Sequence, residues 1–163
     1  MILILPHEIV AKLVDSLTQA GSREIGGILM GEHIDVDTFQ VKELTVQRRG
    51  GTFAAFVRLV EEIIAPLRTF FHVTRHDYTR FNYIGEWHSH HSFALTPSGR
   101  DHSTMFEIIM DPHLGAHFVV LMLVKLNSAK TLDCSVTVYQ PNDKAFVGRV
   151  LQGVKVIEHE DVT

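Results

Sequence analysis

The sequence has little cysteine, no large excess of either charge and no long apolar run. Its single cysteine, Cys134, excludes an internal disulfide. A formal net charge of -4 leaves no broad basic surface, so we expect no nucleic-acid partner. The opening apolar run "MILIL" stops at Pro6 without a basic leader, which is too little for a signal peptide or a membrane span. These features predict a cytoplasmic protein with no membrane partner.

The composition is that of an ordinary globular protein. With 163 residues, 45% of them hydrophobic and 21% charged, the chain can bury a core without disulfides or a structural metal. We therefore expect a single domain over residues 1–163. Cys134 lies in the alternating run "LDCSVTVY", which predicts a small buried residue on a strand.

The first third of the chain predicts a helix followed by a hairpin. Apolar residues recur at helical spacing through residues 6–20, and Gly21 ends the pattern. Two apolar or alternating runs, 24–34 and 38–47, are separated only by "DVD", which is typical of antiparallel neighbours.

The rest of the chain mixes helices and strands. Residues 56–75 predict a helix that Pro66 kinks or divides. Further along we expect strands at 82–90, 117–126 and 132–141, and a helix from the N-cap Thr96, with Pro97 at its first position, through Met110. Residues 145–160 are ambiguous. Short connections between strand pairs predict an α/β fold with a mixed β-sheet flanked by helices.

Histidines and an aspartate gather in the stretch "GEWHSHHSFALTPSGRD". On a strand, His88 and His90 project to the same side. Ser98 and Asp101 are three residues apart in the first turns of the following helix, so they share one face. Two imidazoles, one carboxylate and an open fourth position form the ligand set of a catalytic zinc, whose bound water is acidified. The spacing therefore predicts a hydrolytic zinc site.

Such a site also needs a general base, and two glutamates are candidates. Glu86 lies two residues before His88 on the same strand face, and Glu24 opens the glycine-bearing run "EIGGILMG". Spacing alone does not separate them.

The whole pattern resembles the JAMM motif of the MPN or JAB metallopeptidases. Glu24 is followed by His88-Ser89-His90, seven residues, Ser98, two residues and Asp101, so the motif's spacing is fully met. The resemblance implies a JAB/MPN, cytidine-deaminase-like fold and one zinc per chain, held by His88, His90 and Asp101. It further implies that Glu24 is the general acid/base, that Ser98 stabilises the oxyanion and that Glu86 only supports the site or the fold.

The short length and "GEWHSH" look like the bacterial JAB subgroup, some of whose members are encoded beside ubiquitin-activating and ubiquitin-conjugating enzyme homologues in anti-phage operons. This resemblance implies a deubiquitinase-like isopeptidase or peptidase that cuts after the C-terminal glycine of a ubiquitin-like protein. The expected partners are that protein or its conjugates and the activating or conjugating enzyme homologues. Trimming of a sulfur-carrier protein and a metal-free MPN scaffold remain as alternatives.

One position departs from the family pattern. The family usually has proline after the second histidine, where this chain has His91. We expect His91 on the rim of the site, with an additional ligand role left open.

Overall fold

A computed structural model describes residues 1–47 and 60–154. The helices are α1 (His7–Ala20), α3 (Val60–Val73) and α4 (Gly99–Met110). The strands are β1 (Ile2–Leu5), β2 (Gly26–Asp35), β3 (Thr38–Leu44), β4 (Phe81–Ser89), β5 (Val119–Leu126), β6 (Leu132–Gln140), β7 (Lys144–Val147) and β8 (Arg149–Gln152). No helix in these two ranges is long and apolar enough to cross a membrane.

The eight strands form one mixed sheet in the order β7-β6-β5-β4-β2-β3-β1-β8. The predicted hairpin of β2 and β3 is confirmed as an antiparallel pair. The centre of the sheet pairs β4 with β2 in antiparallel and with β5 in parallel orientation. The prediction of an α/β fold with a mixed sheet flanked by helices is therefore confirmed.

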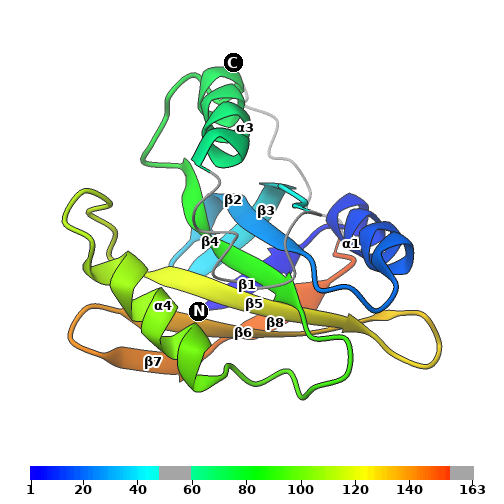
Figure 1. Cartoon of the computed structure of the whole chain (residues 1–163). Helices are drawn as coiled ribbons and strands as arrows, with labels where there is room; N and C mark the ends of the chain where they lie inside the picture. Colours follow the sequence, from blue (N-terminus) through cyan, green and yellow to red (C-terminus); the bar gives the residue numbers. More distant parts are fainter. Residues whose placement is uncertain (48–59, 155–163) are drawn as a thin grey trace.

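Alternation along the central strands separates two apolar layers. On one face, Val120 and Met122 of β5 pack with Trp87 and with Leu13 of α1. On the other face, the alternating β5 residues pack against α4, while β2 residues pack against α3. Figure 1 shows α4 lying across β5 and β6, with α1 on the opposite side of the sheet. The helices thus cover both faces of the sheet.

Three sequence predictions need correction or refinement. The helix around Pro66 is neither interrupted there nor divided, because α3 runs continuously from Val60 to Val73, and the predicted residues 56–59 lie outside the described ranges. Cys134 is on a strand as predicted, but it is only partly buried at the border of the core, where the side-chain amide of Gln152 donates to its Sγ at 3.2 Å. The ambiguous C-terminal run contains β7 and β8.

Candidate metal centre

The two histidines of the motif stand at the end of the central strand β4. His88 is its penultimate residue and His90 follows directly after it. Their ring centroids lie 4.8 Å apart, and the residues are 4% and 9% exposed. The two-residue period of the strand therefore brings both imidazoles to one face, as the sequence predicts.

The aspartate reaches the histidines from the start of α4. The Nε2 atom of His88 lies 3.2 Å from Oδ1 of Asp101, which is 4% exposed. The other carboxylate oxygen of Asp101 accepts the Ser98 main-chain N–H at 2.7 Å, and the Asp101 N–H donates to the Ser98 hydroxyl oxygen at 3.2 Å. This capping box fixes the carboxylate while leaving one oxygen turned toward His88.

The cap of this helix differs from the sequence prediction. Ser98, and not Thr96, is the N-cap, so α4 begins at Gly99 and Pro97 precedes the helix. The reason is the residue three positions on, since Asp101 can return a hydrogen bond to Ser98 whereas the corresponding residue for Thr96 is Gly99. The shift makes Asp101 at once a cap residue and a candidate ligand.

Several interactions act on the charge of Asp101. Burial raises the pKa of its carboxyl, but the hydrogen bonds from His88 and Ser98 act in the opposite direction and prevail. The pKa of Asp101 is therefore lowered well below its ordinary value. The carboxylate is ionised throughout the physiological range, which is the state that binds a cation.

The loop between β4 and α4 orients the second histidine. Nδ1 of His90 lies 2.8 Å from the carbonyl oxygen of Ala94, and a carbonyl can only accept, so Nδ1 donates there and Nε2 is the ring nitrogen available to a metal ion. The Ser135 hydroxyl holds the next carbonyl, that of Leu95, at 2.7 Å and ties the loop to β6. Sequence reasoning missed these partners because a main-chain carbonyl has no signature of its own.

These three side chains fit a metal ion. One ligand atom from each of His88, His90 and Asp101 lies within 4.8 Å of the others, and within the described ranges this is the one group of three or more such residues with that property. Two imidazoles, one ionised carboxylate and a hydrogen-bonded outer partner are the donor set of a metal centre with an open position.

Glu24 lies close in the fold but makes no hydrogen bond to the three ligands within the described residues. It precedes β2 and is partly exposed. The neighbouring residue Ile25 bonds to Ser89 through both of its main-chain groups, at 2.8 and 3.0 Å. Since Gly26 pairs with His88, the same register places Glu24 across from His90. Ser98, by contrast, is exposed at the helix N-terminus beside Asp101.

Gly26 packs closely against the first histidine. A Cβ atom at this position would lie 2.5 Å from the Trp87 carbonyl oxygen and 2.9 Å from Cβ of His88, so only glycine permits this close approach. The main chain of β2 therefore lies directly against β4 beside His88.

Glu86 occupies a different environment on the same strand. It is 7% exposed and pairs in register with Ile28 on one side and Leu121 on the other. Burial raises the pKa of Glu86 from 4.5 to about 7. Because its neighbours on both adjacent strands are apolar, the Glu86 carboxyl stays protonated below neutral pH in the folded protein.

His91 does not join the metal group. It is exposed and lines a small pocket with Ser89 and the C-terminal end of α1, on the opposite side of β4 from His88 and His90. The pocket also includes Lys125 and Lys130. The candidate ligand group within the described residues therefore does not include His91.

The fold and this site define a mixed α/β domain with a candidate metal centre at the end of its central strand. A family profile described as prokaryotic homologs of the JAB domain matches residues 6–135, which is more than half of the chain. The chain therefore belongs to the prokaryotic JAB family. Some members of the wider JAB/MPN group are zinc isopeptidases.

Two similar solved structures, with TM-scores above 0.5, share the fold of this chain. A protein from Desulfitobacterium hafniense has a TM-score of 0.60 at 15% identity, with 96% of this chain and 97% of that chain covered. A protein from Salinibacter ruber has a TM-score of 0.54 at 16% identity, with 91% and 90% covered. A JAB1/MPN domain protein from Archaeoglobus fulgidus has a TM-score of 0.47 at 13% identity, with 91% and 97% covered. Comparison with curated proteins gave no match.

Proposed function

We propose that this chain is a zinc-dependent isopeptidase or peptidase that hydrolyses the bond after the C-terminal glycine of a ubiquitin-like protein. The observation that carries the proposal is the convergence of His88, His90 and Asp101, with the carboxylate ionised and one imidazole held by a hydrogen bond. Membership of the JAB family, which includes metallopeptidases, supports the same chemistry.

The roles of the chain's own residues follow from their positions. A zinc ion at this site would acidify a water molecule and polarise the scissile carbonyl. Glu24, across from His90, takes a proton from the attacking water and delivers it to the leaving amine. The Ser98 hydroxyl oxygen accepts from Asp101, so its own proton is free to stabilise the developing oxyanion at the helix N-terminus.

The substrate class rests on the family resemblance, which implies a substrate that ends in glycine. The proposed partners are a ubiquitin-like protein or its conjugates, together with the activating and conjugating enzyme homologues that would attach it, in the cytoplasm. The departure at His91 leaves the metal side of β4 unchanged, since that residue faces the other way.

The direct test is mass spectrometry of products from a ubiquitin-like protein fused through its C-terminal glycine to a short peptide. We expect cleavage directly after the glycine, loss of cleavage with a chelator, and persistence after thiol alkylation. Glu24→Gln should keep its metal and lose about 100-fold or more in turnover, because the base is removed while the ligands stay.

Glu86→Gln is the matched control, because it is the other glutamate near His88. It should retain turnover within about tenfold if Glu24 is the base. If Glu86→Gln lost more turnover than Glu24→Gln, the base would be Glu86. Cleavage that survives chelation but stops on alkylation would contradict a zinc mechanism. If the zinc-loaded protein bound the ubiquitin-like fusion but did not cleave it, the chain would be a scaffold.

A further inference from the structure

The capping box fixes the Asp101 carboxylate within its own helix, but it does not place that helix against the strand that carries the histidines. The contact of α4 with β5 and β6 is largely apolar, through residues such as Met105 and Ile109. Apolar packing is not directional, so by itself it constrains the position and rotation of a helix less sharply than a hydrogen bond does. Metal–ligand distances vary by only about 0.2 Å, so a ligand on a helix depends on how that helix is held.

A buried tyrosine of β6 makes a directional contact with the start of α4. The hydroxyl of Tyr139 lies 2.9 Å from Nδ1 of His102, the residue that follows Asp101 in the first turn of the helix. Within the described ranges it is the one hydrogen bond that joins α4 to β6. Tyr139 is fully buried, and the ring of Phe106, one turn further along α4, meets it edge-on with 5.2 Å between the centroids. Tyr139 therefore contacts two successive turns of the helix.

The charge of Asp101 also acts on the Tyr139 hydroxyl. Burial raises the pKa of Tyr139, and the negative charge of Asp101 raises it further, so the hydroxyl keeps its proton throughout the physiological range. The contact between His88 and Asp101 joins α4 to β4 as well, but both of its atoms belong to candidate ligands. Tyr139 is thus a polar anchor of α4 that is not itself part of the ligand set.

The same strand holds the loop that orients another ligand. Ser135 lies four residues before Tyr139 and therefore on the same face of β6. Its hydroxyl donates to the Leu95 carbonyl at 2.7 Å, one residue beyond the Ala94 carbonyl that accepts from the His90 ring. Strand β6 carries none of the three candidate ligands, yet its two hydroxyls contact the helix and the loop that position two of them.

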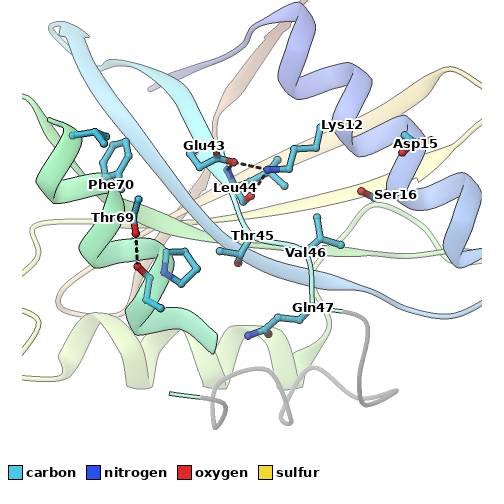
Figure 2. Close-up of a pocket in the computed structure, with 13 residues that line it drawn as sticks. Lys12, Asp15, Ser16, Glu43, Leu44, Thr45, Val46, Gln47, Thr69 and Phe70 are labelled. Atoms are coloured by element: carbon cyan, nitrogen blue, oxygen red, sulfur yellow. Dashed lines mark hydrogen bonds and ion pairs between the residues drawn. The ribbon is translucent and has the colours of Figure 1, made fainter. Parts of the chain in front are cut away.

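We infer that Tyr139 and Ser135 are positioning residues of the metal centre. Through His102, Tyr139 fixes the start of α4 and with it Asp101, and through the loop, Ser135 fixes the ring of His90. The inference rests on the metal centre of the proposed function but not on its substrate or its reaction. Neither residue lines the open groove between α1 and α3 that Figure 2 shows, so variants at these two positions do not change the lining of that groove.

The test is zinc affinity, measured by titrating zinc into chelator-freed apoprotein in the presence of a competing chromophoric chelator. Tyr139→Phe should weaken zinc binding about tenfold, the lower end of the effect of losing an outer partner, because Tyr139 acts through the helix and not on the ligand itself. His102→Phe should weaken it by the same factor. The double variant Tyr139→Phe, His102→Phe should lose no more than either single variant, because both changes remove one and the same hydrogen bond.

Tyr78→Phe is the matched control, because it removes the same kind of hydrogen bond at the far end of β4. The Tyr78 hydroxyl lies 2.8 Å from Nδ1 of His76, in the turn that precedes the strand. The zinc affinity of this control should stay within about twofold of the wild type, since neither residue is a partner of a ligand. Ser135→Ala should weaken binding about fivefold, and Ser135→Thr, which keeps the hydroxyl, should restore it. The losses of Ser135→Ala and Tyr139→Phe should multiply, because the two residues act on different ligands.

A merely structural role would lower the stability of the fold without changing the coordination of a bound metal. Cobalt(II) separates the two roles, because its visible absorption depends on the geometry of its ligands. At saturating cobalt, Tyr139→Phe and Ser135→Ala should show altered bands, whereas Tyr78→Phe should show the wild-type spectrum. Wild-type zinc affinity in both variants, or wild-type cobalt spectra in both, would overturn the inference. A wild-type protein that binds zinc but cleaves no substrate would contradict the proposed function alone.

Discussion

Two buried carboxylates, Glu32 on β2 and Asp101 on α4, differ in the partners that surround them. They are 6% and 4% exposed. Glu32 accepts from the Arg80 guanidinium at 2.6 Å and lies 3.3 Å from the Lys42 ammonium. Asp101 lies 3.2 Å from an imidazole and accepts a main-chain N–H.

The difference lies in what the partners can still bind. Arginine and lysine only donate and keep their charge, so the cluster at Glu32 is satisfied within the protein. A neutral imidazole offers a lone pair, and two of them beside an ionised carboxylate form a ligand set. Burial of a carboxylate therefore does not by itself distinguish an ion pair that holds strands together from a metal centre.

The largest expected effect separates these two carboxylates by metal content. Asp101→Asn keeps an oxygen that can accept the Ser98 N–H but loses the charged ligand, so purified protein should fall from about one zinc per chain to nearly none. Glu32→Gln should retain the full zinc content. Inductively coupled plasma mass spectrometry on both variants provides the measurement. Equal zinc in the two would show that Asp101 is not a ligand.

Much of this comparison is visible in the sequence, because it depends on local spacing. The two-residue period of a strand brings His88 beside His90, and the three-residue spacing from Ser98 to Asp101 is a helical one. Both spacings depend only on the local strand or helix and not on contacts with the rest of the fold. The alternating and helical apolar patterns predicted most of the elements for the same reason.

Other features depend on contacts between distant segments. Strand β1 lies between β3 and β8 in parallel, and nothing in "MILIL" specifies either neighbour. The run containing β7 and β8 was ambiguous because these strands have four residues each and β7 is exposed throughout. The environment of Glu86 likewise depends on its neighbours Ile28 and Leu121, which come from two other strands.

A second prediction extends the comparison to Glu86, which is buried with no hydrogen bond or ion pair to any described residue. Its pKa is raised from 4.5 to about 7, so between these values the unfolded chain releases a proton that the folded chain retains. The free energy of unfolding should therefore fall as pH rises through this window, by about 3 kcal/mol from this group, and then level off. Its contribution is fully present below pH 4.5.

Urea unfolding of chelator-treated protein at pH 5 and pH 8 measures this effect. Glu86→Gln, which cannot ionise, should lose most of that difference, while Glu32→Gln should leave it in place. An unchanged pH dependence in Glu86→Gln would show that the carboxyl is solvated or paired in solution.

The smallest expected effect concerns the cations around Glu32. Arg80→Met removes the guanidinium but leaves Lys42 to balance the carboxylate, and the Arg80 side chain is 56% exposed, so solvent already screens much of the attraction. We expect a loss of about 1 kcal/mol in the free energy of unfolding, measured by urea titration, with zinc content unchanged. Lys42→Met should cost less, because its distance to Glu32 is longer. A loss above about 3 kcal/mol for Arg80→Met would mean that Glu32 is left without a counter-charge, as a buried pair broken at one partner would be. Lys42 would then be too weak a partner to balance the carboxylate by itself, and the contrast with Asp101 would rest on the arginine.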